Sequence, residues 1–167
     1  VAMGDIPYME DHIAQFEEPF LKDVEKENPV FSIHIGDIKG GSNLCTDEIF
    51  VKVRNQLNSL NHPLIFTPGD NEWTDCHRPR TRNKLKDKTE EKFTFPLERL
   101  QKLRELYHSG DMSLGQNKLR LTRQSKSKKY RNFPENVYWQ YKNVTFAMLH
   151  IVGSNNNFED ESGRPST

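Results

Sequence analysis

Three Gly-Asp pairs recur in the first half of the chain at nearly equal intervals of 32 and 33 residues. The pairs are Gly4-Asp5, Gly36-Asp37 and Gly69-Asp70. One such pair after an apolar run is typical of an ordinary turn. Three carboxylates that converge would repel one another and lose hydration unless a cation lay between them, and carboxylate oxygens suit divalent metal ions. The repeated spacing therefore favours a metal site over three unrelated turns.

The segments that carry the aspartates alternate with amphipathic segments. Strands are expected at residues 1–5, 29–35 and 63–67, and helices at residues 9–27 and 47–60. Pro19 interrupts the first helix, and Thr46 is a suitable N-cap for the second. This order predicts an α/β domain with a parallel sheet. Because the carboxyl ends of parallel strands lie at one edge of a sheet, the three aspartates are expected to meet there.

The second half of the chain is more polar and is expected to contribute one further helix and a hairpin. The expected elements are a helix over residues 95–108, a loop over residues 111–135, and a hairpin of residues 137–141 and 144–152. Leu97, Leu100, Leu103 and Leu106 line one face of this helix, which predicts that the face is buried.

The order of these motifs resembles the amino-terminal part of calcineurin-like metallophosphoesterases. That family carries Asp-x-His, then Gly-Asp, then Gly-Asn-His-Asp/Glu at strand ends. The equivalents here are Asp5-Ile6-Pro7, Gly36-Asp37 and Gly69-Asp70-Asn71-Glu72. The resemblance implies a four-layer αββα sandwich, incomplete at the C-terminus of this chain. It also implies two divalent metal ions, with Fe, Mn or Zn as the expected metals, and hydrolysis of a phosphate mono- or diester by a metal-activated hydroxide.

The resemblance also implies roles for single residues. Asp5 would bind one metal and Asp37 would bridge both, while the next ligand would be Asp70 or, with a shift of one residue, Asn71. Pro7 replaces a histidine ligand of the family, and Asn71 occupies the position of its catalytic histidine. These departures leave a non-catalytic metallophosphoesterase-like binding protein as the alternative.

Two residues beyond the third motif are candidates for the remaining chemistry. His77 could protonate the leaving group, because histidine is suited to acid catalysis near neutral pH. Arg78 could bind the phosphate of the substrate as a bidentate donor. Both positions are equally typical of loop-surface residues. Of the other histidines, His34 and His150 are expected in the core, and His12, His62 and His108 at the surface.

The two cysteines, Cys45 and Cys76, each follow a predicted site loop by a few residues. This placement favours a disulfide between the loops over two free thiols. A disulfide would indicate an oxidising compartment, so that a secreted or periplasmic location is favoured.

The composition is balanced in charge but not evenly distributed. The 24 basic and 24 acidic residues give a net charge of zero. Residues 1–50 hold 11 acidic and 3 basic residues, and residues 51–167 hold 13 acidic and 21 basic residues. Only 34% of the chain is hydrophobic, which is low for a self-contained domain. We therefore interpret residues 1–167 as a single domain, part of a larger fold, with a polar and basic insertion at about 78–134.

A run of seven basic residues without an acid extends from Lys118 to Arg131. It could attract a phosphorylated substrate. Nucleic acid is a possible partner, but a solvated loop is the simpler interpretation. No apolar run approaches the roughly 20 residues of a membrane-spanning helix.

Overall fold

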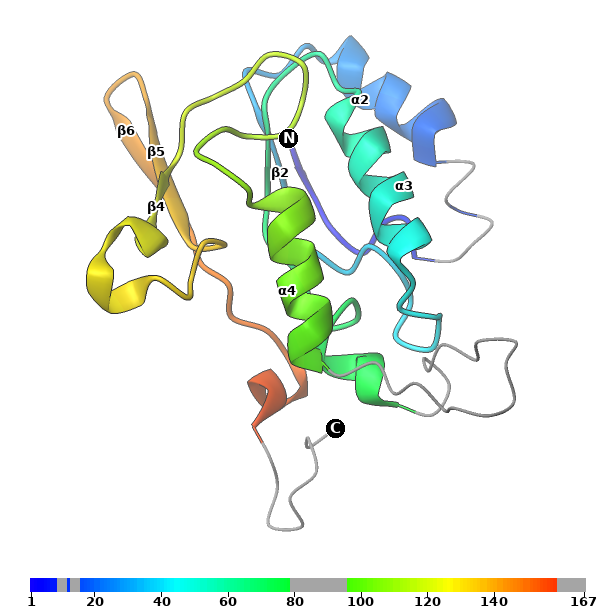
Figure 1. Cartoon of the computed structure of the whole chain (residues 1–167). Coiled ribbons are helices and arrows are strands. Elements are labelled where there is room, and N and C mark those ends of the chain that lie inside the picture. The colour runs from blue at the N-terminus through cyan, green and yellow to red at the C-terminus, as the bar shows by residue number, and fades with distance from the viewer. Residues whose placement is uncertain (9–11, 13–15, 79–95, 159–167) are drawn as a thin grey trace.

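The computed structural model describes residues 1–8, 12, 16–78 and 96–158, which form two sheets with helices on one side (Figure 1). The first sheet is parallel, in the order β1 (Ala2–Met3), β2 (Ser32–His34) and β3 (Leu64–Phe66). The second is antiparallel, in the order β4 (Thr122–Arg123), β5 (Val137–Tyr141) and β6 (Val144–Met148). The predicted α/β class, parallel sheet and hairpin are therefore confirmed, and the strands are shorter than expected.

Helical segments connect the parallel strands in the predicted order. The π-helical turn η1 (Phe16–Leu21) and helix α2 (Lys22–Lys26) connect β1 to β2. Pro19 lies inside η1, while residues 9–11 and 13–15 of the predicted helix lie outside the described residues. Helix α3 (Asp47–Asn58) connects β2 to β3. Thr46 caps α3 as predicted, because its hydroxyl oxygen accepts the backbone N–H of Ile49 at 3.3 Å.

Helices α3 and α4 (Pro96–Tyr107) share one core with the face of the parallel sheet that carries Leu64 and Phe66. The rings of Phe66 and Tyr107 stack at 4.3 Å, and the Tyr107 hydroxyl donates to the Phe50 carbonyl at 2.7 Å. The expectation that Leu97 lies on the buried face is wrong, since Leu97 is 64% exposed. The buried face turns instead through Pro96, Leu100, Leu103 and Tyr107, because the aromatic ring at the end of α4 reaches Phe66.

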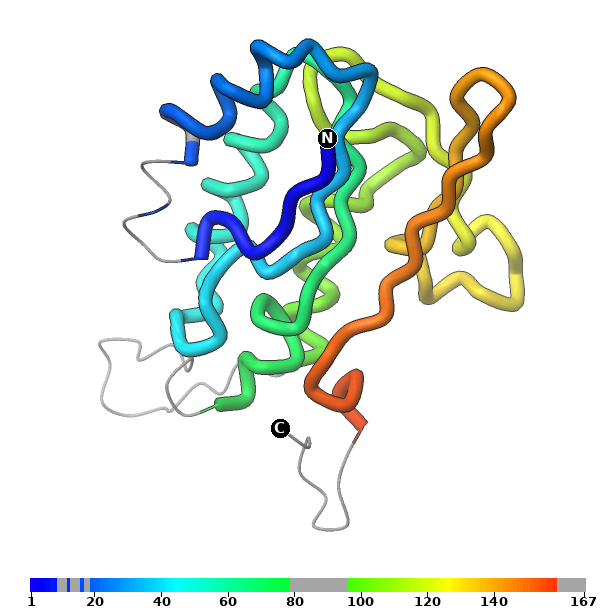
Figure 2. Tube along the Cα trace, turned by 180° about the vertical axis from the view of Figure 1, so that it is seen from behind, coloured from blue at the N-terminus to red at the C-terminus, as the bar shows by residue number. Residues whose placement is uncertain are grey.

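The opposite face of the parallel sheet packs against the antiparallel sheet, as the view from behind shows (Figure 2). Side chains from β2 and β3, such as Ile33 and Ile65, meet Trp139 of β5 in a second core. Phe31 contacts Trp139 edge-on at 5.5 Å, and Trp139 stacks on Phe146 at 5.4 Å. The described layers are therefore helix, parallel sheet and antiparallel sheet. None of the helices in this part of the chain has the length and apolar character that a membrane crossing requires.

The segment between α4 and β5 is ordered, so the expectation of a loop at 111–135 is only partly correct. It contains β4 and the short 3₁₀ helices η3 (Gln124–Lys126) and η4 (Lys128–Tyr130). Arg123, a member of the basic run, is 5% exposed and donates to the carbonyls of Gly110 and Pro134. Lys126 pairs with Asp111 at 2.6 Å. The buried Arg123 thus holds the basic run against the domain, while the other basic side chains of the run are exposed.

Two histidines expected at the surface are buried. His62 is 8% exposed, because it lies against Ser32 Oγ at 2.7 Å and Glu25 at 3.1 Å. His108 is 5% exposed and contacts Arg123. Burial and the charge of Arg123 lower the pKa of His108 to about 3, so that its imidazole is neutral near pH 7. His34 is buried as predicted.

Candidate functional site

The three aspartates meet at the carboxyl edge of the parallel sheet, as the sequence predicts. Asp5, Asp37 and Asp70 line one cavity of about 450 Å³, together with Met148 at the end of β6 and residues 149 and 151–153 that follow it. The strands β1, β2 and β3 are neighbours in sequence order, so that each Gly-Asp turn adjoins the next. The backbone N–H of Asp5 donates to the Gly36 carbonyl at 3.0 Å, which joins the first two turns.

Glycine is required where the second and third turns touch. Gly36 has φ +89°, and a Cβ at this position would overlap the backbone of Gly69. A Cβ at Gly69 would overlap the carboxylate of Asp37. The Gly-Asp repeat therefore reflects close backbone packing as well as the position of the acid.

Asp37 is the central carboxylate of the cluster. Its Oδ1 accepts the backbone N–H of Asn71 at 3.2 Å, and the side chain is half-buried. Burial raises the pKa of Asp37 to about 6, and the charges of Asp70 and Asp5 contribute in the same direction. A cation placed among these carboxylates would offset both the burial of Asp37 and the repulsion from Asp5 and Asp70, because it would favour the ionised forms.

Glu72 is a buried acid beside Asp37 to which the sequence assigns no separate role. It is 0% exposed, and its Oε1 accepts the backbone N–H groups of Gly69 at 2.7 Å and Asp37 at 3.2 Å. Its Oε2 has no hydrogen-bond partner within the described residues. Burial and the charge of Asp37 raise the pKa of Glu72 to about 7. The signal available in the sequence was an acid two residues after the third Gly-Asp pair.

A segment that follows the second sheet holds Asp70 in place. Ser154 Oγ lies 3.0 Å from Asp70 Oδ2 and 2.8 Å from Asp75 Oδ1. A Cβ on Gly153 would lie 2.6 Å from Asp70 Oδ2, so that glycine permits this close approach. Asp75 is 2% exposed and also pairs with Arg78 at 2.6 Å. Asp75 thus orients both the Ser154 hydroxyl and the Arg78 guanidinium.

The structure separates Asn71 from Asp70. Asp70 lines the cavity, and Asn71 does not. The Asn71 amide lies instead against Gly41 in the loop after β2, where a Cβ added to the glycine would lie 2.7 Å from Asn71 Oδ1. The carboxylate of Asp75 and the guanidinium of Arg78 adjoin the same glycine. Of the two registers left open by the sequence, this arrangement brings Asp70, and not the Asn71 amide, to the other two aspartates.

Neither His77 nor Arg78 lines the aspartate cavity. His77 is the last residue of the 3₁₀ helix η2 (Thr74–His77), and Arg78 directly follows it. His77 Nδ1 lies 2.5 Å from the Thr74 carbonyl oxygen, and Arg78 pairs with Asp75. Their roles as proton donor and phosphate contact stay predictions, and each would have to leave these contacts to reach the cavity.

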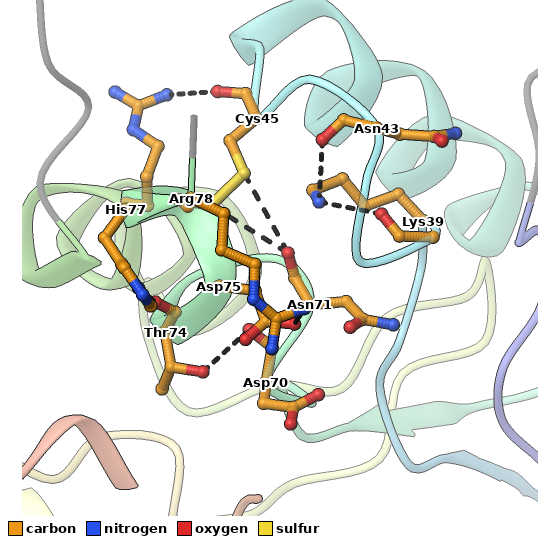
Figure 3. The surroundings of a disulfide bond; sticks show 12 residues. Lys39, Asn43, Cys45, Asp70, Asn71, Thr74, Asp75, His77 and Arg78 are labelled. Atoms are coloured by element: carbon orange, nitrogen blue, oxygen red, sulfur yellow. Dashed lines mark hydrogen bonds and ion pairs between the residues drawn. A yellow bond between two sulfur atoms is a disulfide. The ribbon is translucent and has the colours of Figure 1, made fainter. Parts of the chain in front are cut away.

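The predicted disulfide between Cys45 and Cys76 is present, with a Cα–Cα distance of 5.9 Å (Figure 3). It joins the loop that precedes α3 to η2. Lys39 supports the same loop from inside, since its 2%-exposed side chain donates to the carbonyls of Gly40 and Asn43 at 3.1 Å. Burial lowers the pKa of Lys39 to about 8, although nearby acids such as Glu72 oppose this shift.

The donors of the cavity suit a hard divalent cation in their chemistry, because all three are carboxylates. Asp5, Asp37 and Asp70 are the residues that would hold it. As they stand, no three His, Cys, Asp or Glu side chains among residues 1–8, 12, 16–78 and 96–158 are grouped closely enough to hold an ion.

No protein-family model matches the sequence, and neither a curated protein nor a solved structure gives a significant match. The fold and the site define a mixed α/β domain with a carboxylate-lined cavity at the carboxyl edge of its parallel sheet. Ligands of open α/β sheets bind at this edge, and the functional argument rests on that position and on its chemistry.

Proposed function

We propose that the chain is a metal-dependent phosphoesterase domain with the metallophosphoesterase fold, and that Asp5, Asp37 and Asp70 hold its divalent cations. One observation carries the proposal: three carboxylates from three successive parallel strands line one cavity. Carboxylates that line one cavity repel one another, since the charges of Asp70 and Asp5 help to raise the pKa of Asp37, and a cation among them would offset this repulsion.

In this proposal some residues of the chain bind the metal ions and others hold the loops that carry the metal ligands. Asp37 follows the middle strand of the three, and its carboxylate and its backbone N–H both bond to the loop after β3, so it is the candidate for a bridging ligand. Glu72 fixes the backbone of the loops that present Asp37 and Asp70. Bound divalent ions would polarise the phosphoryl oxygens and lower the pKa of a water nucleophile. The carboxylate-only donor set favours Mn among the expected metals, since carboxylates suit harder ions.

We also propose that the protein is located in an oxidising compartment. The Cys45–Cys76 disulfide is typical of proteins in oxidising environments. A secreted or periplasmic location would keep this bond formed and the site loops joined.

The test is hydrolysis of p-nitrophenyl phosphate and bis-p-nitrophenyl phosphate by the purified chain with Mn²⁺, Mg²⁺, Fe²⁺ or Zn²⁺. We expect metal-stimulated hydrolysis that Asp37→Asn abolishes. The matched control is Asp23→Asn, because the Asp23 side chain is 64% exposed and pairs only locally with Lys26. Full activity of Asp37→Asn would refute the assignment. Cation binding by calorimetry without hydrolysis would support the non-catalytic alternative.

A further inference from the structure

A second cavity, of about 280 Å³, is lined by other residues than the aspartate cavity, but the same segment of the chain reaches both. The segment that follows β6 contributes to both: residues 151–153 line the first cavity, and His150, Asn156 and Asn157 line the second. Helix α4 and residues 132–136 complete the second cavity, and Trp73 extends it toward the loop that carries Asp70. Its volume lies just below the range of about 300–1,000 Å³ typical of small-molecule sites.

The charged groups of this cavity neutralise each other. Arg104 forms a bidentate pair with Glu135, with Nη2–Oε1 at 2.7 Å and Nε–Oε2 at 3.0 Å. Glu135 is 1% exposed, and His150 Nδ1 lies 3.3 Å from the same Oε1. Because the guanidinium is already engaged by a carboxylate, the wall offers no surplus positive charge to a phosphate. An uncharged ligand fits this wall better than an anion.

Three residues of the wall carry buried polar atoms without hydrogen-bond partners in the described part of the chain. They are Trp73 Nε1, His150 Nε2 and Asn157 Oδ1. The His150 side chain is only 6% exposed. An unsatisfied buried polar group is destabilising, and all three residues line this cavity, so a ligand bound there is a candidate for their partner. The indole nitrogen can only donate, the amide oxygen can only accept, and the imidazole nitrogen can do either.

The wall of the cavity is also apolar and partly aromatic. Leu97 is 64% exposed and Phe133 is 43% exposed, and both side chains line the cavity. An exposed aromatic ring beside unsatisfied donors and acceptors is the combination that holds a planar heterocycle, since the ring stacks and the edge forms hydrogen bonds.

We propose that this cavity binds the nucleobase of a nucleoside or nucleotide. Phe133 would stack on the base, and His150, Asn157 and Trp73 would meet its polar edge. The proposal rests on the proposed function in one respect only: the phosphate of a bound nucleotide would lie toward the aspartate cavity. Binding of the base itself needs neither cation nor hydrolysis.

The test is calorimetric titration of the full chain, free of added metal, with adenosine, ribose and inorganic phosphate. We expect saturable binding of adenosine with one site, and no binding of ribose or phosphate to this cavity. Phe133→Ala should weaken adenosine binding by roughly 5- to 150-fold, because base–aromatic stacking contributes about 1–3 kcal/mol. The matched control is Tyr138→Ala, an aromatic residue that is 49% exposed on β5 and does not line the cavity; it should bind as the unmodified chain does.

A pair of substitutions tests the histidine. In His150→Gln an amide can take the position of Nε2, whereas in His150→Asn an amide can take the position of Nδ1 beside Glu135. We expect His150→Gln to retain adenosine binding better than His150→Asn. Absence of adenosine binding to the unmodified chain, unchanged binding by Phe133→Ala, or binding of ribose in place of adenosine would each overturn the proposal. Asp37→Asn should bind adenosine normally, so failure of the phosphoesterase assignment is distinguishable from failure of this one.

Discussion

Removal of the Cys45–Cys76 disulfide should destabilise the domain by about 4 kcal/mol. The bond closes a loop with a sequence separation of 31 residues. In the chain-entropy treatment, such a loop removes about 12 cal/mol/K from the unfolded ensemble, which is about 4 kcal/mol at 25 °C. Since 1.4 kcal/mol changes an equilibrium constant tenfold, the ratio of unfolded to folded chain should rise by roughly 500-fold.

The assay is urea unfolding followed by far-ultraviolet circular dichroism, for the oxidised chain and for Cys45→Ala/Cys76→Ala. Both sulfurs are fully buried, so the free energy of unfolding is also measured for the chain reduced with dithiothreitol, which keeps their volume. We expect the reduced chain and the double variant to lose similar amounts of stability. A loss below about 1 kcal/mol in both would refute the reasoning, because the loops would then be held together without the bond.

Three further perturbations test the packing and the charges. Stability should fall as pH rises from about 4.5 to about 7, because burial raises the pKa of the Glu72 carboxyl to about 7 and the folded chain binds its proton more tightly than the unfolded chain does. Glu72→Gln should weaken this dependence in urea unfolding at pH 5 and pH 8, and Asp37, whose pKa is raised to about 6, should account for the rest. Gly36→Ala should cost more than Gly110→Ala in thermal unfolding, since both glycines have positive φ but only Gly36 has backbone within reach of a new Cβ; equal losses would contradict the proposed contact. Arg104→Leu should cost about 3–5 kcal/mol, because it removes the bidentate partner of the buried Glu135 and leaves that carboxylate with the contact to His150 at 3.3 Å. The additional change Glu135→Leu should restore much of this loss.

The sequence was most informative where local chemistry decides the structure. Thr46 predicts its helix because a hydroxyl in that position satisfies a free N–H. The Gly-Asp repeat predicts the convergence of Asp5, Asp37 and Asp70 because strand order and strand direction follow from the alternation of elements. The disulfide followed from the same reasoning, since both cysteines lie shortly after neighbouring strand ends.

The sequence was least informative where tertiary packing decides burial. His62 and His108 lie beside polar residues in the sequence, and only contacts with distant elements make them core residues. Ser154 is separated from Asp70 by 84 residues, and no local pattern connects them. Leu97 has the spacing of a core residue, but Tyr107 fills the space on the other side of the helix.

The Ser154 hydroxyl carries a single hydrogen, yet its oxygen lies within hydrogen-bond distance of two carboxylates, Asp70 and Asp75. It can therefore donate to only one of them at a time when both are ionised. Asp70 faces the cavity, and Asp75 holds Arg78 next to the disulfide. A cation bound to Asp70 would compete with the Ser154 hydroxyl for that carboxylate, so the hydroxyl would donate to Asp75 instead. The direction of this one hydrogen bond, on the side of the loop that faces the disulfide, would then differ between the filled and the empty cavity.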